Sequence, residues 1–104
     1  MERDTFLIEM YKALGHPIRL EIVRILKEGP LCVCDILPRL DSEQSNASQH
    51  FSVLKNAGIV KRYRKGSQMM YEVVDPLVYQ LLSLSETLLK NRLDRTREAL
   101  SKEG

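Results

Sequence analysis

The fold is decided by the stretch DSEQSNASQHFSVLKNAG, which occupies residues 41–58. Its apolar side chains recur every three or four residues, which is the spacing of the buried side of an amphipathic helix. Asp41 is expected to cap this helix, with Gln44 in the reciprocal position of a capping box. The pattern predicts a helix over residues 42–57, and its buried side is formed by Ala47, Phe51 and Leu54.

The exposed side of this helix carries short amides and hydroxyls. Amide side chains can pair with adenine in the major groove, and hydroxyls and backbone N–H groups reach phosphates. Glu43 is the one acid nearby, and it would have to point away from phosphates or accept from a cytosine amino group. From this helix we expect the DNA contacts to come from Gln44, Ser45, Asn46, Ser48, Gln49 and His50.

Upstream, three helical elements are predicted. Apolar residues at helical spacing indicate a first helix over residues 6–14, and Pro17 suits the first turn of a second helix. Gly29 and Pro30 stop that second helix. A short third element follows over residues 33–40, although a proline within it removes one backbone donor.

Downstream of the quoted stretch the apolar period changes from 3.6 to 2. Residues 59–64 and 68–74 therefore read as two strands, joined by the turn Lys65-Gly66-Ser67. A basic strand by itself is usually a solvated edge, but beside a polar helix it favours contact with phosphates or the minor groove. The residues of this region expected to contact DNA are Lys55, Arg62, Arg64, Lys65 and Gln68.

A last long helix begins after Asp75 and Pro76 and carries a wide leucine-rich face. The rest of the chain is too small to cover this face, so the simplest cover is the same helix of a second copy. We therefore expect a homodimer built from the first and last helices. Its interface should include Phe6, Met10, Leu77, Leu81, Leu84 and Leu88.

Together these elements predict a winged helix-turn-helix, mainly α with a two-stranded β-hairpin wing and about five helices. At 104 residues, we expect residues 1–104 to form one domain. A net charge of +2 excludes a polycationic tail. No signal peptide, membrane span or catalytic constellation is recognised, so we expect a cytoplasmic protein that is not an enzyme and has no membrane partner.

Several motifs in the same order resemble those of the ArsR/SmtB repressors. Residues 13–22, ALGHPIRLEI, resemble the opening signature of that family, and residues 44–60 resemble its recognition helix and the exit from it. The hairpin ending at Met70 and Tyr71 resembles its wing. The resemblance implies a dimeric repressor that binds an operator with imperfect two-fold symmetry and leaves the DNA when an inducer binds.

Two positions depart from the family pattern within the recognition helix. Glu43 stands where the family commonly has serine, and Gln49 stands where it commonly has histidine. The base preference of the family is therefore not carried over to this chain.

Two cysteines, Cys32 and Cys34, lie in LCVCD, residues 31–35, which resembles the thiolate motif of the arsenic- and soft-metal-sensing members. Thiolates prefer soft metal centres, and a helix N-terminus stabilises the thiolate anion. At a strand-to-helix transition such a pair can turn both sulfurs to one side. The expected inducer is arsenite, antimonite or a soft divalent metal ion, with no cofactor needed for the fold.

The number of ligands leaves two alternatives open for the cysteines. Leu37 occupies the position where the arsenic sensors often have a third cysteine, and the chain has no other cysteine. The pair could instead respond to thiol oxidation, through an intersubunit or mixed disulfide rather than a strained Cys32–Cys34 bond. It could also consist of two half-buried residues without a ligand.

A different function for the same fold also stays open. A winged helix can serve as a protein-interaction module that does not read DNA. Such a module predicts an apolar or mixed recognition face, whereas this one is polar and stands beside a basic wing.

Overall fold

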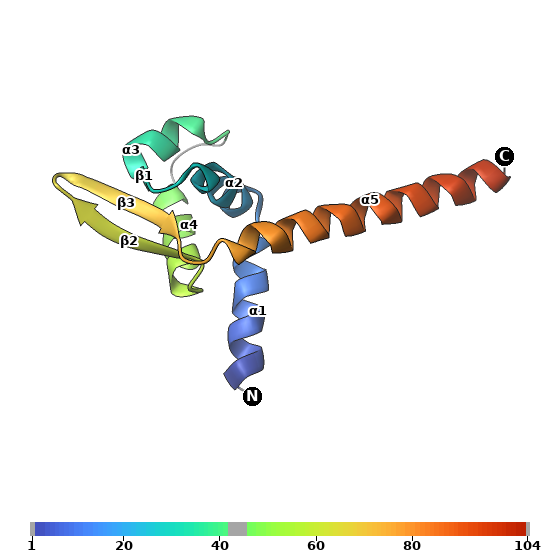
Figure 1. Ribbon diagram of the computed structural model, residues 1–104, viewed down its shortest axis with the longest axis horizontal. Coiled ribbons are helices and arrows are strands. Elements are labelled where there is room, and N and C mark those ends of the chain that lie inside the picture. Colours follow the sequence, from blue (N-terminus) through green and yellow to red (C-terminus); the bar gives the residue numbers. More distant parts are fainter. Residues whose placement is uncertain (1, 42–45, 104) are drawn as a thin grey trace.

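The computed structural model describes residues 2–41 and 46–103, in which helices and a small sheet enclose one apolar core while two helices project from it (Figure 1). The long last helix and the first helix point away from this core in different directions. The elements are α1 (Glu2–Leu14), α2 (Pro17–Ile25), η1 (Leu26–Glu28), β1 (Leu31–Cys32), α3 (Val33–Ile36), η2 (Leu37–Arg39), α4 (Ala47–Asn56), β2 (Val60–Lys65), β3 (Gln68–Val73) and α5 (Leu77–Glu103).

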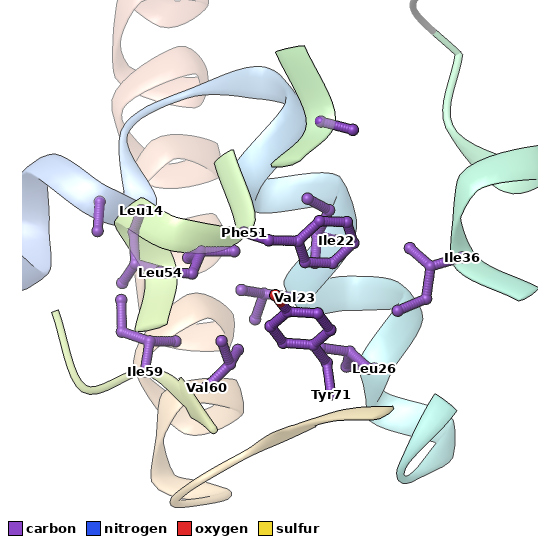
Figure 2. Close-up of a cluster of buried hydrophobic side chains, with 12 residues drawn as sticks. Leu14, Ile22, Val23, Leu26, Ile36, Phe51, Leu54, Ile59, Val60 and Tyr71 are labelled. Atoms are coloured by element: carbon purple, nitrogen blue, oxygen red, sulfur yellow. The ribbon is translucent and has the colours of Figure 1, made fainter. Parts of the chain in front are cut away.

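The core forms where α4 packs between α2 and the sheet. The rings of Phe51 on α4 and Tyr71 on β3 stack with their centroids 4.4 Å apart. Ile22 of α2, Ile36 of α3 and Leu54 of α4 are fully buried around them (Figure 2). The predicted buried side of α4 is confirmed, because Ala47, Phe51 and Leu54 are all buried.

The sheet has three strands in the order β1-β3-β2, all antiparallel, so it contains one strand in addition to the predicted two-stranded wing. The additional strand is β1, in which Leu31 pairs with Tyr71 and Cys32 with Met70. Two residues are too few to show a period-2 pattern, and this explains why sequence patterning misses the strand. The hairpin itself is confirmed, and the positive φ of 62° at Gly66 gives it the tight turn that only glycine adopts easily.

The start of the recognition helix was predicted wrongly. Helix α4 begins at Ala47, and Asn46 occupies its N-cap position without a side-chain capping bond. Asp41 lies six residues before Ala47 and is therefore not the N-cap residue of α4; its backbone N–H donates to Glu21 Oε1 of α2 at 2.9 Å. Gln44, the other half of the expected capping box, lies outside the described residues.

The third predicted element is divided in two by proline. The α-helical turn α3 ends at Ile36, and the 3-10 turn η2 begins at Leu37 with Pro38 in its first turn. Because proline has no N–H to donate, the regular α-helical ladder cannot continue through it. The predicted end of α1 at Leu14 and the opening of α2 by Pro17 are confirmed, whereas α1 begins at Glu2, four residues before its predicted start.

Helix α5 is attached to the core only through its first turns. Asp75 Oδ1 accepts from the Leu77 N–H at 3.0 Å, and the Tyr79 hydroxyl donates to the Val23 carbonyl at 2.6 Å. Burial raises the pKa of Tyr79 to about 12. Leu81 and Leu82 pack against the core, whereas the leucines farther along the helix are exposed. Among the helices of the described residues, none is long and apolar enough to cross a membrane.

Leu54→Ala should lower the free energy of unfolding by about 2–5 kcal/mol, because it removes a fully buried side chain and leaves a cavity. Urea denaturation followed by circular dichroism measures the change. Ser52→Ala is the matched control on the exposed side of the same helix and should change the free energy by about 0.5 kcal/mol or less. Equal losses in the two variants would contradict this assignment of the core.

Candidate nucleic-acid interface and cysteine pair

The outer side of α4 presents polar side chains to solvent. Asn46, Ser48 and Gln49 are exposed, and Lys55 is exposed in the last turn of the helix. These positions are the ones from which a recognition helix reaches base edges and phosphates. Gln44 and Ser45, which were predicted to contribute to the same surface, lie outside the described residues.

His50 is placed differently from its neighbours on α4. It is half-buried, and its Nδ1 accepts a hydrogen bond from Arg19 Nη1 on α2 at 3.1 Å. Its ring also lies 4.3 Å, centroid to centroid, from that of His16. Burial, followed by the charges of His16 and Arg19, lowers the pKa of His50. The sequence pattern grouped His50 with the exposed polar residues because a histidine at a helix surface carries no signal for a partner on another helix.

The wing supplies the positive charge of the candidate interface. Arg62, Arg64 and Lys65 are exposed on β2, and none has an ion-pair partner in the part of the chain that the structure describes. Lys61 differs from them, because its Nζ lies 3.0 Å from Glu72 Oε1 on β3. Three unpaired cations on a projecting hairpin suit contact with phosphates.

The helix and the wing meet at one groove. Helix α4 packs against β2, and a groove of about 330 Å³ lies between them and α3. Ser48 and Ser52 from the helix and Arg62 from the wing line this groove, above a floor that includes Phe51 and Tyr71. The fold therefore brings the hydroxyls of α4 and a guanidinium of the wing, which are distant in the sequence, to one surface.

Cys32 and Cys34 are joined by a disulfide with an S–S distance of 1.97 Å. We expected an intersubunit or mixed disulfide in preference to this bond, and that expectation is corrected. Cys32 is extended and ends β1, whereas Cys34 lies in the first turn of α3. This change of backbone conformation sets the two Cα atoms 5.1 Å apart, within the usual range for a disulfide. The predicted convergence of both sulfurs on one side is confirmed.

The cysteine pair adjoins the wing. Cys32 is buried and caps α3, since its Sγ accepts from the Cys34 N–H at 3.0 Å. Cys34 is exposed, and its Sγ lies 3.8 Å from Gln68 Nε2 at the start of β3. Within residues 2–41 and 46–103, no group of three or more His, Cys, Asp or Glu side chains could hold a metal ion. Comparison with known proteins identifies the family to which this helix and wing belong.

Residues 16–62 match the profile of the bacterial regulatory protein arsR family. An uncharacterized HTH-type transcriptional regulator of Methanocaldococcus jannaschii is 39% identical over 89 residues, which cover 85% of this chain and all of that protein. The chain belongs to the arsR family. It is therefore a DNA-binding transcriptional regulator and not an enzyme, and its polar helix and basic wing are those of an ArsR-type winged helix-turn-helix.

Two solved structures and a further relative are also similar to this chain. The crystal structure of Mycobacterium tuberculosis Rv0081 matches with a TM-score of 0.75 at 32% identity, over 90% of this chain and 95% of that one. A homodimeric winged helix-turn-helix domain from Mycobacterium bovis shares the fold, with a TM-score of 0.77 at 24% identity, over 90% of this chain and 87% of that one. A cadmium resistance transcriptional regulatory protein homolog of Staphylococcus aureus is 39% identical over 75 residues, covering 71% of this chain and 62% of that protein.

Replacing Arg62 or Arg64 of this ArsR-family wing with alanine should weaken binding to most DNA sequences. Each lost phosphate contact should also reduce the slope of log affinity against log salt by about 0.9, because fewer counterions are released. Fluorescence anisotropy over a salt series measures both quantities. Lys61→Ala is the matched control on the same strand, because Glu72 already pairs with Lys61. If the arginine variants keep the full slope, the wing does not contact phosphates.

Proposed function

We propose that this chain is a homodimeric repressor whose operator affinity falls when a soft metal ion or metalloid binds to reduced Cys32 and Cys34. The observation that carries the proposal is the position of the pair, at the first turn of α3 and in contact with Gln68 of the wing. A ligand at these sulfurs therefore acts directly on elements that frame the DNA-binding surface.

The DNA-reading part of the proposal rests on the groove between α4 and the wing. Ser48 and Arg62 line this groove and are exposed, and Gln49 is exposed on the same helix. Hydroxyls and a guanidinium suit phosphates, while the Gln49 amide suits a base edge. Such a surface favours DNA over a protein partner, because an interaction module would present an apolar or mixed face. The test is retardation of operator DNA at low salt, which an interaction module would not produce.

Two exposed apolar helix faces support the dimer. Phe6 on α1 and Leu84 and Leu88 on α5 are each 66% exposed or more in the single chain. An apolar groove of about 230 Å³ where α1 meets α5, lined by Met10, Leu77 and others, continues these faces into one surface. Leu81 lies at the inner edge of that surface, because it packs partly against its own core. A second copy is the occupant with matching faces, and the Mycobacterium bovis relative is homodimeric.

The donor atoms of the site favour soft inducers. Once the disulfide is reduced, Cys32 and Cys34 provide two thiolates that converge on one side, and thiolates prefer thiophilic ions. In this proposal solvent or a small thiol completes the site, because residues 2–41 and 46–103 hold no group of three or more His, Cys, Asp or Glu side chains that could bind a metal ion. The cadmium resistance relative supports an ion of this class. A coupling of about 1–3 kcal/mol would lower operator affinity by about 5- to 150-fold.

The disulfide itself favours a second candidate, a thiol-redox switch at the same residues. In that reaction the two thiols of Cys32 and Cys34 lose two electrons and two protons to an oxidant such as hydrogen peroxide, which becomes two water molecules. The oxidised pair then cannot bind a soft metal ion, because a disulfide provides no thiolate. Oxidation and metal binding would thus compete for one pair.

Leu88→Glu should convert the dimer to a monomer and weaken operator binding by about ten-fold or more, because the interface would have to bury an unpaired carboxylate. Sedimentation velocity measures the first effect and anisotropy the second. Ser83→Glu is the matched control, since it adds the same charge on the side of α5 that faces Arg24 and Lys27. A Leu88→Glu protein that stays dimeric would refute the α5 interface.

The double variant Cys32→Ser, Cys34→Ser should bind operator DNA normally but lose its response to the inducer. Serine is suited to this test because it preserves an N-cap acceptor at the start of α3. Arsenite, antimonite, cadmium and zinc are titrated with a non-thiol reductant present, and peroxide is titrated separately with a chelator. Release by peroxide alone would favour the redox candidate. Release of the double variant by any of these agents would refute a role for the cysteines.

A further inference from the structure

One arginine joins three helices, α1, α2 and α4. Arg19 on α2 donates from Nε to the Ala13 carbonyl at 2.7 Å and from Nη2 to the Lys12 carbonyl at 3.2 Å. Both acceptors belong to the last turn of α1, where carbonyls have no partner within the helix. The remaining guanidinium nitrogen, Nη1, reaches His50 of α4 at 3.1 Å. The planar fork of Arg19 thus spans from the end of α1 to the recognition helix.

The chemistry of the contact with His50 defines its protonation state. An arginine is a donor only, so His50 Nδ1 must accept, and its proton must then lie on Nε2. The ring of neutral His50 also contacts that of His16 in a tilted arrangement, and the Nδ1 of His16 accepts from the Ile18 N–H at 3.1 Å and caps α2. The hydrogen bond between Arg19 and His50, with the ring of His16 beside it, therefore forms a junction that requires His50 to be uncharged.

We propose that Arg19 is a positioning residue that holds the recognition helix α4 at a set angle to α1 and so determines operator affinity without touching DNA. This inference rests on the proposed dimer through α1 and α5. In a two-fold dimer both recognition helices must enter major grooves about 34 Å apart. A small rotation of α4 relative to the dimer helix occurs in both subunits, so its effect on the spacing is doubled.

The junction also makes the position of α4 sensitive to pH. A protonated His50 has no free Nδ1 to accept from Arg19, and it places a second cation beside that guanidinium. Among the described residues, the charged and titratable side chains in contact at this junction are His16 and Arg19 of α2 and His50 of α4. Because the pKa of His50 is lowered in the folded protein, the stabilising contact is present above pH 6.5. It is lost as the pH falls from 6.5 through the folded-state pKa.

The test compares Arg19→Ala, Arg19→Lys and a matched control, Arg24→Ala, in the full chain. Arg24 is on the same helix and pairs with Glu86 of α5 at 3.1 Å, so its removal costs the same charge without disturbing the junction. Operator affinity, its salt slope and its pH profile from 5.5 to 8 are measured well below the unfolding temperature. Sedimentation checks that each protein remains dimeric, and stoichiometric titration gives the folded, active fraction.

At pH 8 we expect Arg19→Ala to bind the operator about ten-fold more weakly than the unsubstituted chain and Arg24→Ala to bind within about two-fold of it. The salt slope of Arg19→Ala should be unchanged, because no phosphate contact is lost. Its affinity should also depend less on pH than that of the unsubstituted protein. Arg19→Lys should fail to restore affinity, because a single ammonium cannot reach three acceptors.

Four results would overturn the inference. They are equal affinities of Arg19→Ala and Arg24→Ala, full rescue by lysine, an unchanged pH profile, and a salt slope reduced by about one, which would place Arg19 on a phosphate. If the unsubstituted chain is monomeric or does not bind operator DNA, the proposed function fails instead. The two failures are therefore distinguishable.

Discussion

The stacking of Phe51 against Tyr71 is the contact on which the rest of the structure depends. It joins the recognition helix to the central strand of the sheet, and β1 and β2 both pair with that strand. Ile22, Leu54 and Val60 close around the two rings, so α2, α4 and the wing share a single apolar cluster. In a domain of this size there is little other buried surface to hold the wing at a defined angle to the helix.

In this arrangement the residues that stabilise the fold are different from those proposed to contact DNA. The inward side of α4 is committed to packing, while Ser48 and Gln49 on the outward side are free of structural partners in the described part of the chain. The wing divides similarly, with Tyr71 buried and Arg62 opposite it in register but exposed. Changes of the outer residues can therefore alter DNA preference at little cost to stability.

The cysteine pair and the arginine junction contact different elements of the fold. Cys32 and Cys34 act on α3 and the wing, whereas Arg19 connects α4 to α1. The two proposals thus give the position of α4 two possible controls, the state of two sulfurs and the charge on a histidine. Both lie outside the apolar core.

Periodic patterns were sufficient for most of the fold and for part of the site. The apolar repeats around Phe51 and Leu54 predicted α4, and the basic alternating stretch from Val60 to Lys65 predicted the wing. Features without a repeat were missed or misplaced. The strand β1 is too short to show one, and the N-cap residue of α4 is Asn46 rather than the expected Asp41.

The sequence by itself determined which residues are buried, which are polar and basic, and which family they belong to, because these properties depend on side-chain type and local spacing. Only the tertiary structure decided which of them meet. The contact of Arg19 with His50 joins residues 31 positions apart, and that of Gln68 with Cys34 joins residues 34 positions apart. Such contacts depend on how α2, α4 and the sheet pack around Phe51 and Tyr71, and this packing is a property of the whole core that no local pattern records.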